Sequence, residues 1–138
     1  MTPPRPAHGC FDLRCANHVL VIRSQGSFNR EGAEALNRAA AELWRAHCAP
    51  EHWGMLIDLR EWEGATAEGY KVAHELRRWA VAHHCAAAAW VFGNAFIRKM
   101  AATGMALVAH PYPVEFFNDV AAANAWLQTQ GLGPVDEA

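Results

Sequence analysis

The sequence lacks a hydrophobic run long enough to span a membrane as a helix. Its longest uninterrupted apolar run, Cys85–Phe92, has the length of a strand, whereas a membrane helix needs about 20 apolar residues. The N-terminal residues Met1–Pro6 also lack the apolar centre of a secretory signal peptide. The sequence therefore predicts no transmembrane segment, and we expect the protein to be cytoplasmic.

Metal-binding spacing is absent too. The four cysteines contain no CxxC pair, and in a reducing compartment we interpret them as small buried apolar residues: Cys10, Cys15, Cys48 and Cys85. The densest histidine groups, His47-Cys48 and His83-His84-Cys85, lack the spacing of a tetrahedral zinc site. A position at a helix C-terminus accounts for these histidines better than a metal site does, because a cation there interacts favourably with the helix dipole. We predict no metal and no cofactor.

Familiar catalytic motifs are missing as well. The sequence contains no GxSxG, GxGxxG or P-loop pattern, and its glycines are those of turns. We therefore assign no catalytic residue. The 12 Lys and Arg residues are scattered and the net charge is −2, which gives no basic surface for a nucleic acid.

What the chain does contain is the composition of one globular domain. Its 138 residues, 52% hydrophobic and 19% charged, fit a single domain with a sizeable core. We predict one domain over residues 1–138, with an ordered core at about residues 10–130 and a loose proline-rich start.

Hydrophobic periodicity predicts an α/β fold. Strands are expected at residues 11–15, 19–22, 55–59, 86–92 and 114–117, and helices at about 30–48, 67–84, 95–108 and from 120 onward. The order is β-β-α-β-α-β-α-β-α, which predicts a mixed five-stranded sheet covered by helices. The first strand is expected to be antiparallel, because a short loop at 16–18 joins it to the second.

Side-chain patterns place caps and buried faces on these helices. Asn29, Thr66 and Asp119 are predicted N-caps, since each side chain can accept an orphan backbone N–H. The second helix has an apolar stripe formed by Val72, Leu76, Trp79, Ala80 and His83. The third helix is expected to face inward through Phe96, Met100 and Leu107.

The segment Trp53–Thr66 reads as a buried strand, then a loop, then a helix start. Asp58, Glu61 and Glu63 cluster after the strand, so an unrecognised small enzyme using an Asp58–Glu63 loop is one alternative. The favoured interpretation is that these carboxylates solvate the loop or pair with arginines such as Arg60.

Tryptophans favour the other function class, a binding module. Trp53 and Trp62 bracket the third strand and are expected to be exposed, unlike Trp44, Trp79, Trp90 and Trp126, which fall on core faces. Ligands of α/β folds bind at the carboxyl ends of parallel strands. The candidate ligand- or partner-binding residues at that edge are Ser27, Phe28, Asp58, Arg60, Trp62, Thr66 and Asn94, with Trp62 as anchor.

The strand order, the phrase Leu56–Gly64 and the ending Phe116–Asp119 followed by Ala125–Leu127 resemble the SpoIIAA-like branch of the STAS superfamily. That superfamily includes bacterial anti-sigma-factor antagonists, and this branch is similar to SEC14-type lipid-binding domains. The resemblance covers about residues 10–130. It implies a non-enzymatic binding or regulatory module. We expect this module to bind a protein partner or a small apolar or lipid-like ligand, and a homodimer is one expected form of the chain.

The same resemblance implies where a phosphorylated serine would lie. The antagonists carry an Asp-Ser-Ser-Gly-like turn at the start of the second helix, and Thr66-Ala67-Glu68-Gly69 occupies that turn here. Gly69 matches, but Ala67 and Glu68 replace both serines. We predict that this chain lacks the phosphoserine switch.

Overall fold

The computed structural model describes residues 6–48, 51–105 and 111–135. Its strands and helices follow one another in the predicted order: β1 (Cys10–Ala16), β2 (Val19–Phe28), α1 (Arg30–Leu43), a π-helical turn η1 (Trp44–Cys48), β3 (Gly54–Ala65), α2 (Ala67–Ala82), β4 (Ala88–Phe92), α3 (Ala95–Met105), β5 (Val114–Phe117) and α4 (Val120–Thr129).

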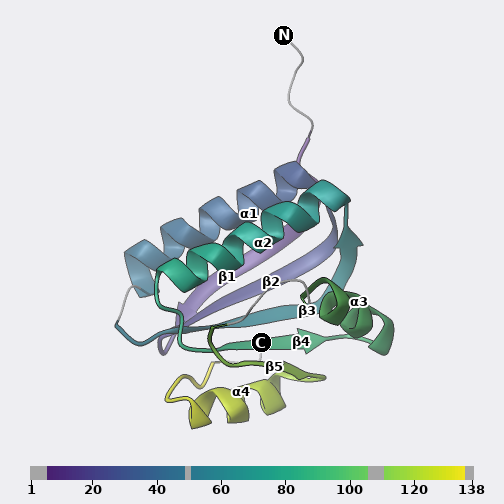
Figure 1. Ribbon diagram of the computed structural model, residues 1–138. Helices are drawn as coiled ribbons and strands as arrows, with labels where there is room; N and C mark the ends of the chain where they lie inside the picture. Colours follow the sequence, from purple (N-terminus) through teal and green to yellow (C-terminus); the bar gives the residue numbers. More distant parts are fainter. Residues whose placement is uncertain (1–5, 49–50, 106–110, 136–138) are drawn as a thin grey trace.

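The five strands of the described residues form one mixed sheet in the order β1-β2-β3-β4-β5. β1 is antiparallel to β2, and the other neighbours are parallel. Helices α1 and α2 lie side by side on one face, α4 covers β4 and β5 on the other, and α3 lies near the ends of β3 and β4 (Figure 1). The predicted fold class and the antiparallel first strand are confirmed. Among the described helices, none is long and apolar enough to cross a membrane.

The predicted helix caps are confirmed at three positions. Asn29 accepts a hydrogen bond from the Gly32 N–H at 2.8 Å, and Thr66 accepts one from Gly69 at 3.0 Å. Asp119 accepts from the Ala122 N–H at 2.7 Å. Each cap satisfies a backbone donor that the first helical turn leaves without a partner.

The predicted loop after Leu59 is wrong, because β3 continues to Ala65. The apolar run ends at Leu59, but β2 extends to Phe28 and supplies backbone partners as far as the pair Phe28 and Ala65. Pairing with a neighbouring strand thus overrides the polar composition of residues 60–65. β4 ends opposite Leu59, so the outer half of β3 has β2 as its strand neighbour.

Two bulges determine which way the outer half of β3 faces. Arg23 pairs with Asp58 but Gln25 pairs with Glu61, so β3 contains one extra residue there, and a second shift follows Gly26. Each extra residue exchanges the two faces of a strand. Trp62 therefore faces the same side as Leu59, although it lies three positions further along the strand, where regular alternation would place it on the opposite face.

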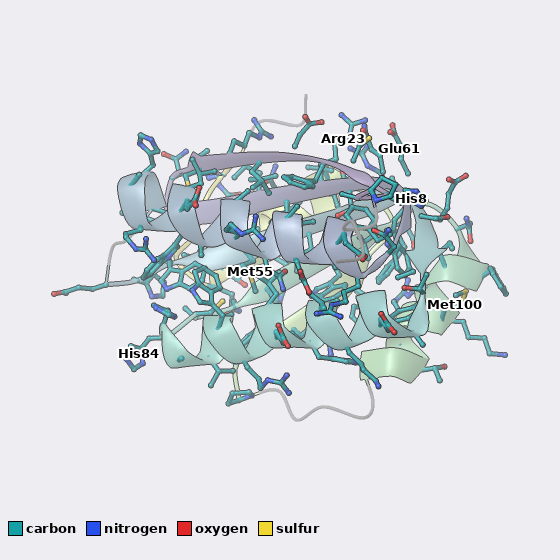
Figure 2. The ribbon with its side chains drawn as sticks, turned by 90° about the horizontal axis from the view of Figure 1, so that it is seen from above. His8, Arg23, Met55, Glu61, His84 and Met100 are labelled. Atoms are coloured by element: carbon teal, nitrogen blue, oxygen red, sulfur yellow. A yellow bond between two sulfur atoms is a disulfide. The ribbon has the colours of Figure 1, made fainter. Side chains whose placement is uncertain are left out.

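Two hydrophobic clusters fill the two sides of the sheet. On the α1/α2 side, Met55 lies beneath the helices (Figure 2) and is 1% exposed. Trp53 is fully buried there, its Nε1 donates to the His83 carbonyl at 2.7 Å, and its ring packs against Trp44 and Trp79. The expectation that Trp53 is exposed is therefore wrong.

The inward face of α3 differs from the prediction by one residue. Phe96 is 70% exposed, whereas Ile97 and Ala101 are buried. Met100 is partly buried, and Leu107 lies outside the described residues. The apolar pattern of this short segment fits a helix that buries Phe96 as well as one that buries Ile97. Packing against β3 and β4 selects the orientation that buries Ile97.

The cysteines also depart from the prediction. Cys15 and Cys48 form a disulfide that joins β1 to η1, with a Cα–Cα distance of 5.7 Å, a usual separation for a disulfide. Cys10 is exposed, and only Cys85 is both unpaired and buried in the described part of the chain. The disulfide removes one argument for the expected cytoplasmic location, because disulfides are rare in reducing compartments.

Candidate functional site

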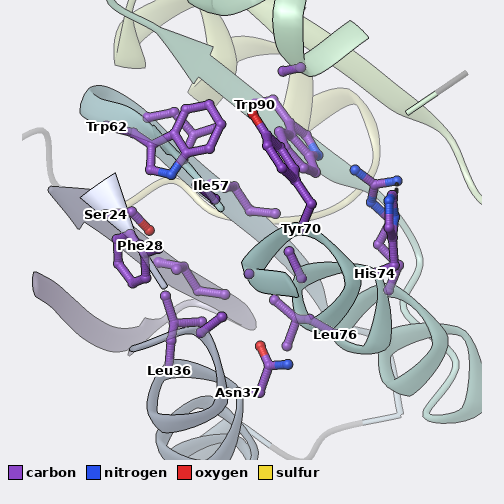
Figure 3. A pocket seen from close by; sticks show the side chains of 18 of the residues that line it. Ser24, Phe28, Leu36, Asn37, Ile57, Trp62, Tyr70, His74, Leu76 and Trp90 are labelled. Carbon is purple, nitrogen blue, oxygen red and sulfur yellow. Dashed lines mark hydrogen bonds between the residues drawn. The ribbon is translucent and has the colours of Figure 1, made fainter. Parts of the chain in front are cut away.

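An apolar cavity of about 120 Å³ lies between the sheet and the α1/α2 layer. Figure 3 shows Phe28 and Trp62 on one side of it, and Tyr70, His74 and Trp90 on the other. The remaining lining side chains are mostly aliphatic and come from β2, β3, α1, α2 and α3; they include Ile22, Ala33, Leu36, Met55, Ile57, Leu59, Leu76 and Ala101.

Strand alternation and one glycine build this cavity. Ile22 and Phe28 are buried on β2, and Ile57 is buried on β3; these residues face the helices. Gly69 brings the first turn of α2 close to the strands, since a Cβ there would lie 3.1 Å from the Phe28 carbonyl oxygen and 3.3 Å from the Ala65 Cβ. A larger residue at this position would push the start of α2 away from β2 and β3.

The cavity reaches the surface where its lining residues are only partly buried. They include Trp62, Trp90 and three residues of α2: Tyr70, His74 and Arg77; Asn37, Ala65 and Leu76 are also partly buried, and Ala73 is exposed. Trp62 and Tyr70 contact each other edge to face, with ring centroids 5.9 Å apart. Apart from the buried Ser24, the interior is therefore apolar, and Tyr70, His74 and Arg77 place polar groups at one side of the opening.

Arg77 is the unusual residue of this opening. Its guanidinium lies over the Trp90 ring at 5.3 Å from the centroid, a cation–π arrangement. Its Nε is buried and has no hydrogen-bond partner among the described residues. In the same residues Arg77 forms no ion pair with a carboxylate. Burial lowers the pKa of Arg77, but an arginine keeps its charge near neutral pH.

His74 adjoins this cation, with its Nδ1 3.3 Å from Arg77 Nη1. Because arginine can only donate, Nδ1 is the acceptor, which leaves the proton of a neutral imidazole on Nε2. Burial lowers the pKa of His74, and the charges of Arg77 and Arg78 lower it further. His74 is therefore neutral near pH 7 and offers one N–H donor.

The acidic residues of β3 lie on the opposite face of the sheet. Asp58 is 5% exposed and accepts hydrogen bonds from Arg60 Nε at 3.0 Å and Nη2 at 2.7 Å. Glu61 pairs with Arg23 at 2.6 Å (Figure 2) and accepts from Gln25 at 2.9 Å. These carboxylates are held by basic and amide side chains, so they do not converge in a cleft as an acid–base pair.

Burial acts to raise the pKa of Asp58, but the hydrogen bonds and charge of Arg60 outweigh it, and the pKa lies below its ordinary value. A general acid or base working near neutral pH needs a carboxyl pKa shifted the other way. The Asp58–Arg60 pair is thus a structural ion pair at pH 7.

The seven candidate residues do not form one site. Phe28 and Trp62 line the cavity, whereas Asp58 and Arg60 lie on the other face. The other three lie at element ends: Thr66 and Asn94 accept from the N–H of Gly69 and Ile97, and Ser27 is exposed at the end of β2.

Sequence reasoning missed the polar side of the opening. Tyr70, His74 and Arg77 follow one another at intervals of four and three residues, which places them on one face of α2. That spacing was visible, but it adjoins the apolar stripe and does not reveal that a cavity lies beside it. In the described residues no group of three or more His, Cys, Asp or Glu side chains lies close enough to hold a metal ion.

A mixed sheet with sequential strand order, one antiparallel edge strand and paired helices over one face matches the SpoIIAA-like fold. Residues 19–128 match the model of the SpoIIAA-like family. The chain belongs to the SpoIIAA-like family, which confirms the resemblance seen in the sequence.

Solved structures share this fold at low sequence identity. An uncharacterised protein with a SpoIIAA-like fold from Shewanella loihica PV-4 has a TM-score of 0.65 and 16% identity, covering 92% of this chain and 99% of that one. An anti-sigma factor antagonist from Mycobacterium paratuberculosis has a TM-score of 0.60 and 18% identity, covering 88% and 95%. Unphosphorylated SpoIIAA, an anti-sigma factor antagonist, has a TM-score of 0.56 and 15% identity, covering 89% and 100%. The curated proteins contain no match.

Proposed function

We propose that this protein is a non-enzymatic regulatory module that binds a small apolar ligand in the cavity beneath α1 and α2. The cavity is the observation that carries the proposal. An unfilled cavity of this volume costs about 3 kcal/mol of stability relative to a packed core. A ligand that fills it offsets that cost.

The paired carboxylates of β3 support a binding module over the enzyme alternative. Asp58 and Glu61 are occupied by Arg60 and Arg23, and they lie on the face opposite the cavity. The cavity itself is lined by no carboxylate among the described residues. The site is therefore suited to binding the apolar part of a ligand rather than to acid–base catalysis by a carboxylate.

The regulatory part of the proposal rests on the related folds. Two of the similar structures are described as anti-sigma factor antagonists, and by analogy the ligand state of this chain controls contact with a protein partner. Thr66 acts as the N-cap of α2, so its hydroxyl has a structural role, and the absence of a phosphoserine switch stays a prediction. Homodimer formation also stays a prediction, which native mass spectrometry of the purified chain tests.

Benzene is the probe that tests the cavity. We expect benzene to shift the methyl NMR signals of Leu36 and Ile57 in the unmodified protein, because both side chains line the cavity. In Ala33→Phe, the new ring occupies much of the space that a benzene-sized ligand needs, and the shifts should disappear. Ala121→Phe is the matched control, since Ala121 is exposed on α4. Unshifted methyl signals in the unmodified protein, or equal shifts in Ala33→Phe, contradict the proposed function.

A further inference from the structure

Arg77 carries a charge that the described residues leave without a counter-charge. No carboxylate pairs with it, and its buried Nε has no hydrogen-bond partner among those residues. Among the ionisable groups that act on Arg77, Tyr112 has its pKa raised to about 12, by burial above all and then by the nearby Cys85 thiol, so it is neutral at pH 7. Partial burial of a cation without a counter-charge is unfavourable. A bound anion would supply the counter-charge that Arg77 lacks.

Donor geometry identifies what kind of anion fits. Arg77 presents a planar set of N–H groups beside the cavity, and His74 accepts from only one of its nitrogens, Nη1. A carboxylate has two oxygens that can accept from two N–H groups of one guanidinium, and charge-assisted hydrogen bonds of this type are about twice as strong as neutral ones. Trp90 holds the guanidinium against its ring and so limits its movement.

Cavity size limits the apolar part of the ligand. The volume of about 120 Å³ is a little below the roughly 150 Å³ of a protein cavity that accepts benzene. A single ring or a short aliphatic chain fits, whereas the acyl chain of a membrane lipid is much larger. The lining is mostly aliphatic and aromatic, so the body of the ligand must be apolar.

We propose that the ligand of this cavity is a small monocarboxylate, with its ring or short chain among Phe28, Leu36 and Ile57 and its carboxylate on Arg77. This inference rests on the proposed function and narrows the apolar ligand to an anion. It also implies that Arg77 is retained for binding rather than for stability.

Calorimetric titration with two matched pairs of probes tests the charge. Benzoate and benzamide share a ring, and hexanoate and hexanamide share a short chain, but only the acids are anions. We expect at least one acid to bind about tenfold or more tightly than its amide, as expected for a hydrogen bond to a charged group. The pair in which the acid binds more tightly than the amide shows whether the apolar part of the ligand is aromatic or aliphatic.

Variants of α2 assign the effect to one side chain. Arg77→Met should lower the affinity for the acid to that of its amide, and Arg78→Met is the matched control, because Arg78 is the next residue on the helix and is exposed. The melting temperature of Arg77→Met should stay the same or rise, whereas a cation with a structural role would lower it. Arg77→Gln is a second variant with the same expected loss of affinity.

The possible outcomes separate the two proposals. If acids and amides bind equally well, or if Arg78→Met loses the preference and Arg77→Met keeps it, the inference is overturned and cavity binding stands. If neither acids nor amides bind and benzene also leaves the Leu36 and Ile57 signals unchanged, the proposed function fails and the inference fails with it.

Discussion

Trp62→Ala distinguishes an anchor for the ligand from a residue that only packs. Trp62 lines the cavity, is partly buried, and contacts Tyr70 edge to face at 5.9 Å. If Trp62 contacts the ligand, truncation should cost about 2 kcal/mol or more of binding free energy, because it also opens that side of the cavity to water. This corresponds to a loss of affinity of about 30-fold.

The same substitution also lowers stability, and the expected size follows from burial. A tryptophan buries at least about 150 Å², and removal of that area at roughly 25 cal/mol per Å² gives about 4 kcal/mol. Since Trp62 is only partly buried, we expect about 3 kcal/mol. Urea unfolding measures this loss, and titration with the acid that binds the unmodified protein measures affinity at a temperature where circular dichroism shows the variant folded.

Trp126→Ala is the matched control for this experiment. Trp126 is also partly buried, but it lies on α4 on the opposite side of the sheet, with its ring 5.9 Å from Phe117. We expect a similar loss of stability with unchanged ligand affinity. If Trp62→Ala and Trp126→Ala lose stability alike and both retain full affinity, Trp62 is a packing residue and the reasoning above is refuted.

Two further predictions concern the other side chains that sequence analysis misjudged. The Cys15–Cys48 disulfide spans 33 residues, so Cys48→Ser should lower the unfolding free energy by about 3.5–4 kcal/mol in urea without reductant; equal stability of the variant would show that the bond does not form. Because the pKa of Asp58 lies below 3.8 when folded, its carboxylate stabilises the fold at pH 7, and this contribution is lost as the pH falls through the folded pKa. Asp58→Asn should therefore cost about 1–3 kcal/mol at pH 7 and less at pH 3, whereas Glu61→Gln, in a more exposed pair, should cost less than about 1 kcal/mol; a pH-independent cost for Asp58→Asn would contradict the ion-pair assignment.

The site shows how far sequence reasoning reached. Phe28 and Trp62, two of the predicted candidates, line the cavity, and their binding role stays a prediction. Asp58 and Arg60 were placed with them only because residues 60–65 were expected to form a loop. The first bulge of β3 sends the Asp58–Arg60 pair and Trp62 to opposite faces of the sheet, and no local pattern encodes that reversal.

What the sequence determined by itself is what depends on near neighbours in the chain. Asn29, Thr66 and Asp119 cap helices through residues three positions away, and the β1–β2 hairpin closes through a two-residue turn at Asn17 and His18. Such interactions involve short chain segments with few alternatives. The element order and the fold class follow from them together with hydrophobic periodicity.

Tertiary structure decided the features that depend on distant partners. β3 continues past its apolar run because β2 pairs with it, Ile97 rather than Phe96 faces inward because of the sheet beneath α3, and Cys15 meets Cys48 across 33 residues. The cavity and the cation beside it belong to the same group, since segments of β2, β3, β4, α1, α2 and α3 must pack before a gap exists beside Arg77. Packing between distant segments sets these positions, and the periodicity of one segment carries no information about the shape of the others.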